Sequence, residues 1–125
     1  MRKVSLNLSL SNNCWMLFKI EATPEFLHEA KKLAKKYPSL KSDIANLAEL
    51  LSADPKQGVP LGKDTYKIRL AIGSKGKGKS GGARVITCVK IISAVVYLVS
   101  IYDKSEQNDI PDKELKERIK NLPLF

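Results

Sequence analysis

The sequence has very little histidine and cysteine, two side chains that often bind metals or transfer protons. Its 125 residues include one histidine, His28, and two cysteines, Cys14 and Cys88. Two distant cysteines and one histidine cannot form a zinc site without several carboxylates. Both cysteines stand among apolar residues, which predicts reduced core thiols rather than a disulfide. We therefore expect neither a metal site nor a disulfide framework.

Long hydrophobic runs are also missing. The longest apolar stretch, residues 91–101, contains two serines and is about half as long as a membrane-spanning helix must be. In residues 1–13, apolar residues alternate with Ser and Asn, so a signal-peptide core is lacking. We expect a cytoplasmic protein without a membrane segment. Its length predicts one domain over residues 1–125, with 1–13 as an extension or an edge strand.

Positive charge is abundant and concentrated in one part of the chain. The sequence has 22 Lys and Arg against 13 Asp and Glu, a formal net charge of +9. Residues 63–90 contain eight basic residues and one acid, and so carry +7 of that charge. Charge focused in this way is typical of proteins that bind nucleic acids.

Within this basic segment, residues 73–82 alternate glycine with lysine. Glycine lets a backbone approach its ligand closely, and lysine adds positive charge. We predict that Lys75, Lys77 and Lys79 bind RNA.

The same loop matches the Walker A pattern G-x-x-x-x-G-K-S from Gly73 to Ser80. That pattern requires a following helix, whose N-terminus holds the phosphates. Here Gly81 and Gly82 precede a run rich in β-branched residues, which favours a strand. We therefore expect no nucleotide cofactor.

Hydrophobic periodicity predicts an α+β fold. An N-terminal helical hairpin packs on a small twisted antiparallel sheet, and a short helix follows. Thr23 and Ser39 are the expected caps of the two hairpin helices, which Pro38 separates. The expected segments are strand 15–22, helices 23–37 and 39–51, loop 54–62, strands 65–72, 84–92 and 95–102, turn 103–111, helix 113–121 and an exposed apolar tail 122–125.

The strand over residues 65–72 alternates between two kinds of side chain. Ile68 and Leu70 fall on one face, and Lys67 and Arg69 fall on the other. Because side chains on a strand point alternately to opposite faces, we expect one face in the core and one lining a basic cleft.

These residue types suit one kind of RNA cleavage that needs no metal. In this reaction the 2′-hydroxyl attacks the adjacent phosphate and the 5′-oxygen leaves. A cluster of Lys, Arg and Tyr can remove the proton, neutralise the phosphorane and protonate the leaving oxygen. The basic segment has almost no carboxylates with which to bind magnesium.

The sequence resembles the RelE/ParE toxin superfamily, and within it the HigB-like branch. The resemblance spans residues 15–120 and rests on four stretches in combination. They are Ala34–Pro38, Tyr66–Leu70, the glycine-lysine loop continuing into Arg-Val-Ile over 74–86, and Ile-Tyr-Asp-Lys-Ser-Glu within Ser100–Glu106.

The resemblance implies a toxin that enters the ribosomal A site and cuts translated mRNA, and a cognate antitoxin that neutralises it. By motif position, Lys67 and Arg69 match basic residues of the strand before the loop. Arg84 matches the arginine assigned to phosphate stabilisation, and Lys104 lies close to the basic position after the last strand.

The family also places a tyrosine near its C-terminal end as a candidate general base. Around Ile110 this chain has aliphatic or polar residues instead, and Tyr102 is the nearest phenol. We include Tyr102 among the predicted catalytic residues, while the identity of the base stays open. Two other functions also stay open: a ParE-like inhibitor that binds DNA gyrase without chemistry, and a plain basic nucleic-acid-binding module.

Overall fold

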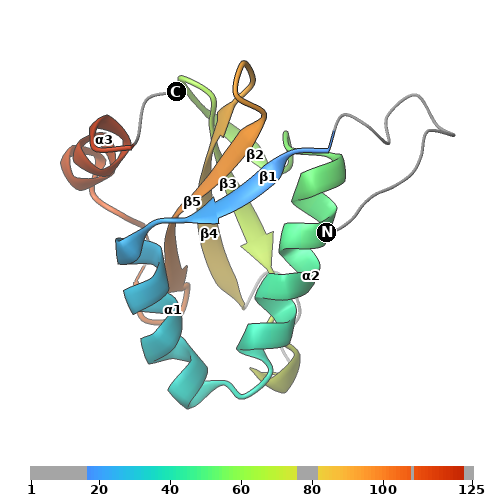
Figure 1. Cartoon of the computed structure of the whole chain (residues 1–125). Coiled ribbons are helices and arrows are strands. Elements are labelled where there is room, and N and C mark those ends of the chain that lie inside the picture. The colour runs from blue at the N-terminus through green and yellow to red at the C-terminus, as the bar shows by residue number, and fades with distance from the viewer. Residues whose placement is uncertain (1–16, 76–81, 108, 123–125) are drawn as a thin grey trace, which may run out of the picture.

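A computed structural model describes residues 17–75, 82–107 and 109–122. The described chain forms a mixed five-stranded sheet with helices on both faces (Figure 1). Its elements, in chain order, are β1 (Lys19–Ala22), α1 (Pro24–Lys36), α2 (Leu40–Ala53), β2 (Val59–Gly62), β3 (Thr65–Leu70), a 3₁₀ turn η2 (Gly73–Lys75), β4 (Ala83–Lys90), β5 (Val95–Asp103) and α3 (Asp112–Lys120). The predicted α+β class, helical hairpin and short C-terminal helix are confirmed.

Helix α1 begins as its sequence predicts. The Thr23 hydroxyl accepts a hydrogen bond from the Phe26 amide at 3.2 Å, and Pro24 occupies the first helical turn. The same hydroxyl donates to the Leu98 carbonyl at 3.0 Å. One threonine therefore caps the helix and fixes its start against β5.

The start of α2 differs from the prediction. Ser39 makes no side-chain capping bond to this helix. Its hydroxyl instead donates to Asp43 Oδ2 at 2.8 Å and accepts from the Ser74 amide at 2.8 Å. The Gly73 amide also donates to Asp43 Oδ2, at 3.1 Å. Ser39 occupies the N-cap position, as predicted, but its side chain binds η2 rather than the helix amides, and this attaches the beginning of the glycine-lysine loop to α2.

The sheet corrects two expectations. Its strand order is β1-β5-β4-β3-β2, and β1 pairs with β5 in parallel, so the sheet is not purely antiparallel. The segment 54–62, expected as loop, contains the edge strand β2. Pro60 and Gly62 obscured this strand, but an edge position tolerates proline because one side of its backbone needs no partner.

The two central strands are the most buried, as expected. All of β5 and all of β4 except Lys90 are buried. Strand β4 ends earlier than predicted, because Ile91 and Ile92 lie in the connecting turn, and Ile92 is fully exposed, whereas β5 ends one residue later, at Asp103. Cys88 is a buried free thiol, as predicted, whereas Cys14 and residues 1–13 lie outside the described residues.

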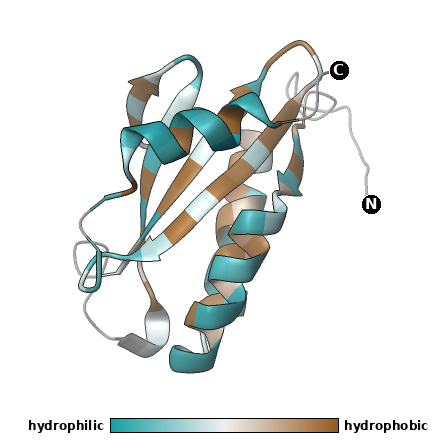
Figure 2. Ribbon diagram, turned by 90° about the vertical axis from the view of Figure 1, so that its left-hand side faces the viewer, coloured by the Kyte–Doolittle hydropathy of each residue, from teal (hydrophilic) through white to brown (hydrophobic). Residues whose placement is uncertain are grey.

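Two apolar clusters cover the two faces of the sheet. The larger lies under α1 and α2 and includes Phe26, Leu40 and Ile68. The smaller lies under α3 and includes Ile86 and Leu115. Figure 2 shows the helices with hydrophilic outer surfaces and hydrophobic residues toward the sheet. The expected exposed tail is wrong at Leu122, which is 6% exposed within the smaller cluster; residues 123–125 lie outside the described residues.

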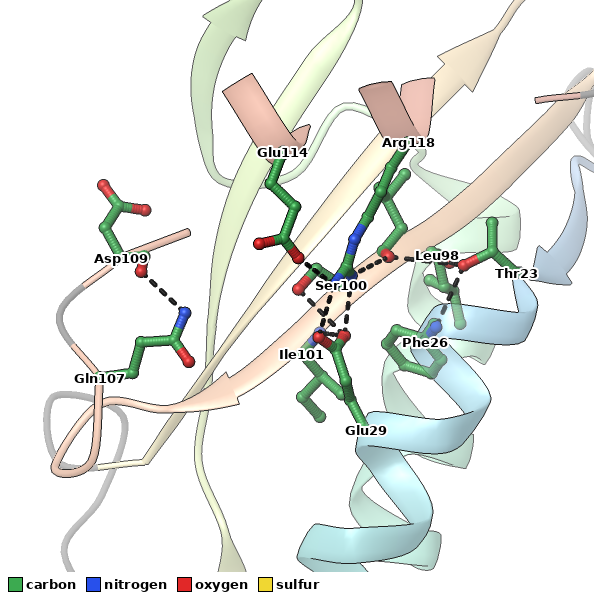
Figure 3. A network of polar contacts seen from close by, with 11 residues as sticks. Thr23, Phe26, Glu29, Leu98, Ser100, Ile101, Gln107, Asp109, Glu114 and Arg118 are labelled. Atoms are coloured by element: carbon green, nitrogen blue, oxygen red, sulfur yellow. Dashed lines mark hydrogen bonds and ion pairs between the residues drawn. The ribbon is translucent and has the colours of Figure 1, made fainter. Parts of the chain in front are cut away.

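Helix α3 is fastened to the rest of the fold by Arg118. Its guanidinium donates to both carboxylate oxygens of Glu29 on α1, at 3.0 and 2.9 Å, and to the Val99 carbonyl at 3.2 Å. It also pairs with Glu114 on its own helix, and Glu29 accepts from Ser100 at 3.1 Å (Figure 3). Hydrogen bonding to Glu29 is the main cause that raises the pKa of Arg118. This network joins α3, β5 and α1.

The glycine-lysine loop returns to the sheet at Gly82. A Cβ at this position would lie 2.1 Å from the Leu70 carbonyl oxygen, so only glycine fits. The chain then enters β4 rather than a helix. The Walker-like letters therefore lack the helix that phosphate binding by that motif requires. Within the described residues, no helix is long and apolar enough to cross a membrane.

A buried carboxylate at the end of β5 connects the sheet with α1 and with the turn that follows β5. Asp103, at the end of β5, is 2% exposed and accepts from the Tyr37 hydroxyl at 2.6 Å. It also accepts from the amide and hydroxyl of Ser105, at 2.9 and 2.7 Å. Lys36 Nζ lies 3.9 Å from it. Asp103 thus joins the end of α1 to the turn that follows β5.

We expect Tyr37→Phe to lower the free energy of unfolding by about 1.5–3 kcal/mol, because it removes a hydrogen bond to a buried charged group. Urea unfolding measures the change. Tyr66→Phe is the matched control, since the Tyr66 hydroxyl has no hydrogen bond within the described part of the chain. Equal stability of the two variants would contradict the role given to the Tyr37–Asp103 bond.

Candidate functional site

Three neighbouring strands bring the predicted basic residues onto one face of the sheet. In the strand register, Arg69 lies opposite Arg84, and Arg84 lies opposite Tyr102. Lys67 precedes Arg69 on the same face of β3 and lies opposite Ile86. Directly opposed side chains of antiparallel strands have Cβ atoms about 4.5–5.5 Å apart. We call Lys67, Arg69 and Arg84 the basic row.

The basic row lies on the face that α3 partly covers. Ile68 and Leu70, which alternate with its β3 members, pack under α1 and α2. Tyr102 packs with Leu115 of α3 in the smaller cluster. The predicted division of β3 into a core face and a basic face is therefore confirmed.

The members of the row differ in exposure. Arg69 is exposed, and its guanidinium forms no hydrogen bond or ion pair with another described residue. Lys67 is half-buried, whereas Arg84 is only 7% exposed and donates to the Ala83 carbonyl at 3.3 Å. The low local dielectric around a buried guanidinium strengthens its attraction for an anion. The basic row thus combines an accessible cation, Arg69, with a buried and partly desolvated one, Arg84.

Asp109 completes the site and was not among the predicted residues. Its Oδ2 lies 3.1 Å from Lys67 Nζ, and its Oδ1 accepts from the Tyr102 hydroxyl at 3.0 Å. The Ile110 amide donates to Oδ1 at 2.9 Å. Gln107 Nε2 donates to the Asp109 backbone carbonyl at 2.8 Å (Figure 3). One carboxylate therefore connects a cation of β3 with the phenol of β5.

These contacts set the protonation states of the site. The pKa of Tyr102 is raised well above its ordinary value of 10.0. Burial is the largest cause, and the hydrogen bond to Asp109 is the next. Burial opposes ionisation of Asp109, but hydrogen bonds from Lys67, the Ile110 amide and Tyr102 together lower the pKa of this carboxyl below 3.8. At neutral pH the phenol is therefore protonated and the carboxylate ionised. The stabilising contribution of Asp109 is present above its unfolded pKa and is lost as the pH falls through the lowered value.

A weak sequence signal pointed to Asp109. It is an acid in the turn before α3 and precedes Ile110, around which the family tyrosine would be expected. An aspartate in a turn is usually explained by local hydrogen bonding. Its partner Lys67 is 42 residues away in sequence, so only the tertiary fold reveals the contact.

The other predicted residues are placed less fully. Lys104 is half-buried in the turn after β5, and its amide donates to the Gly82 carbonyl at 3.2 Å, next to the start of β4. No described residue forms an ion pair with the Lys104 ammonium. Lys75 ends η2, whereas Lys77 and Lys79 lie outside the described residues. RNA binding by these three lysines stays a prediction.

The one histidine of the sequence lies away from the basic row. His28 is exposed on α1, on the other side of the sheet. Among residues 17–75, 82–107 and 109–122, no group of three or more His, Cys, Asp or Glu side chains is arranged to hold a metal ion.

Comparison with known proteins gives a family and a fold. A family described as the RelE toxin of the RelE/RelB toxin–antitoxin system matches residues 32–122. No curated sequence is significantly similar to the chain.

Solved structures share the fold at low sequence identity. A mutant of the E. coli toxin RelE in the free state is 16% identical, with a TM-score of 0.57, over 86% of this chain and 99% of that one. The same mutant bound to a peptide of the antitoxin RelBc is 19% identical, with a TM-score of 0.51, over 86% and 99%. The toxin–antitoxin complex RelBE2 of Mycobacterium tuberculosis is 15% identical, with a TM-score of 0.51, over 70% and 91%.

We expect Asp109→Asn to lower the pKa of Tyr102 toward its ordinary value, because a neutral amide no longer opposes formation of the negative phenolate. The tyrosine Cζ resonance followed by NMR over alkaline pH measures the shift. Glu106→Gln, on the same loop and paired with Lys36, should leave the titration of Tyr102 unchanged. An unaltered Tyr102 titration in Asp109→Asn would refute the coupling.

Proposed function

Since the chain belongs to the RelE family of toxins of toxin–antitoxin systems, we propose that it is a metal-independent endoribonuclease that cleaves mRNA on the ribosome and thereby stops translation. One observation carries the proposal: the in-register row of Arg69, Arg84 and Tyr102, with Lys67 and Asp109 beside it. A protein that only blocks a partner needs no such convergence of cations, phenol and carboxylate on one face.

The proposed reaction uses the attached 2′-hydroxyl as nucleophile. Its oxygen forms a bond to phosphorus, the bond to the 5′-oxygen breaks, and a 2′,3′-cyclic phosphate and a 5′-hydroxyl result. Arg69 and Arg84 would stabilise the extra negative charge of the phosphorane, the step at which fixed cations contribute most. Their placement on adjacent strands holds them at a nearly constant separation.

The protonation states assign the remaining roles. Tyr102, protonated at neutral pH, serves as a hydrogen-bond donor that holds Asp109 rather than as the base. Asp109 is the ionised acceptor of the site and would take the 2′-hydroxyl proton. Lys67, now paired with Asp109, would supply a proton to the leaving 5′-oxygen. Lys104 lies at the margin of this arrangement and would contact a neighbouring phosphate.

A cognate antitoxin is the expected second partner. The structurally similar toxins were solved with antitoxin in the RelBE2 complex and with the RelBc peptide. On this chain, an antitoxin that neutralises by direct masking would place acidic residues over the basic row. The apolar tail is a weaker docking point than its sequence indicated, because Leu122 is buried.

We expect Arg84→Ala to reduce mRNA cleavage about 10²–10³-fold, the usual loss for one donor that stabilises the transition-state charge. Growth after induction and primer extension on mRNA from translating cells measure the effect. Lys90→Ala removes the same charge from the other end of β4 and should stay toxic. Because Arg84 is buried, unfolding curves must show that the variant folds, and exposed Arg69→Ala provides a second test.

A folded Arg84→Ala variant as toxic as the parent would refute the assignment. Toxicity without mRNA cuts but with arrested DNA replication would favour a gyrase inhibitor instead.

Binding to ribosomes or single-stranded RNA should weaken steeply with salt, because phosphate contacts release counterions. Three contacts from the basic row give a slope of log K against log salt of about −2. Arg69→Ala should reduce the slope by about 0.7, whereas Lys120→Ala, at the end of α3, should not change it. Affinity that does not change with salt would rule out phosphate recognition.

A further inference from the structure

A hollow adjoins the basic row, between α3 and the β2–β3 hairpin. Its volume is ≈ 390 Å³, within the range of small-molecule sites. Lys67 and Asp109 line it on the side of the row. An RNA with a phosphate on the row can therefore place a neighbouring nucleoside at the mouth of this hollow.

Part of the lining is apolar. Leu61 of β2 lies on one side, and Ile110, Leu115 and Ile119 lie on the other. Leu61 is 42% exposed, so this wall is open to a ligand rather than closed by the protein. Aliphatic side chains on two sides can hold a flat ring by its faces.

The polar groups around these walls have an unusual arrangement. Two carboxylates, Asp109 and Asp112, line the hollow, together with the lysines Lys63, Lys67 and Lys116. Carboxylates repel a phosphate but accept hydrogen bonds from N–H groups. The hollow therefore suits a neutral ring that carries N–H donors for the carboxylates. The lysines suit anionic groups, such as phosphates, attached on either side of that ring.

We propose that this hollow is a nucleobase pocket, which receives one unpaired base of the RNA whose phosphate lies on the basic row. The inference rests on the proposed function. Adenine, cytosine and guanine carry an exocyclic amino group that can donate a hydrogen bond to a carboxylate, whereas uracil offers only its ring N3–H, between two carbonyl oxygens that a carboxylate repels. Carboxylate side chains accept from cytosine N4 in this way in other nucleic-acid complexes. The pocket therefore discriminates against uracil.

Asp112 is the specificity-determining residue of the pocket. It lies at the start of α3, and Leu115, Lys116 and Ile119 follow it at helical spacing on the face that lines the hollow. Asp109 already holds Lys67 and Tyr102, which leaves Asp112 as the carboxylate available to the base. Glu117 lies on a different side of α3, where it lines a separate surface depression with Lys113.

The test compares 2′-O-methylated tetranucleotides of adenosine, cytidine and uridine, which cannot be cleaved, together with inorganic phosphate. Amide and methyl NMR spectra of the full chain report both affinity and location. We expect the A and C oligomers to bind at least about fivefold more tightly than the U oligomer. They should shift Thr65, Leu115 and Ile119, whereas phosphate alone should shift only the basic row.

Asp112→Asn presents both a donor and an acceptor, so it should bring the affinities for the three oligomers within about twofold of one another. Glu117→Gln makes the same change in charge on the same helix and should keep the wild-type preference. Wild-type-like spectra establish that both variants are folded.

The outcomes separate this inference from the function on which it rests. Equal affinities with no shifts in the pocket, while phosphate still shifts the row, would overturn the nucleobase pocket and leave the proposed function standing. Pocket shifts that occur only with the neutralising antitoxin would also overturn it and make the hollow a protein-docking site. If neither phosphate nor RNA binds, the proposed function itself fails.

Discussion

The buried carboxylate of Asp103 holds together parts of the chain on which the site depends. It accepts from Tyr37, which ends the first helix of the hairpin, and from Ser105, which begins the turn after β5. That turn leads to Asp109, whose two oxygens reach Lys67 and Tyr102. Hydrogen bonds to a buried carboxylate are strong and costly to leave unmade. The helical hairpin, the central strand β5 and the face that carries the basic row are thereby coupled through one side chain.

The sheet fixes the backbone positions from which the cations of the proposed chemistry extend. The cations of the basic row come from the middle of β3 and the beginning of β4, so backbone hydrogen bonds fix their spacing. Groups that are already oriented need little reorganisation when charge develops in the transition state. The ion pair between Lys67 and Asp109 keeps two opposite charges together while the site is empty, and an incoming phosphate competes for the lysine. The buried Arg84 and the exchangeable Lys67–Asp109 pair thus serve different purposes.

Much of this arrangement was visible in the sequence, and the remainder depends on contacts that sequence periodicity does not describe. The stripes of α1 and α2, the two central strands and the two faces of β3 follow from the spacing of apolar residues. The parallel pairing of β1 with β5, the edge strand β2 and the burial of Leu122 depend on tertiary neighbours. Among the site residues, Lys67, Arg69 and Arg84 were found as strand-borne cations. Asp109 was missed because an isolated acid in a turn resembles any other turn residue until its partner is known.

The strand order also determines when the site can form during synthesis. Strand β5 lies between β1 and β4, although it is the last strand to be made. Until it leaves the ribosomal tunnel, β1 has no neighbour and the basic row lacks Tyr102 and Asp109. Contacts between residues distant in sequence form late and slowly, because long loops must close first. The site is therefore expected to assemble only after β5 and the turn that carries Asp109 have been synthesised.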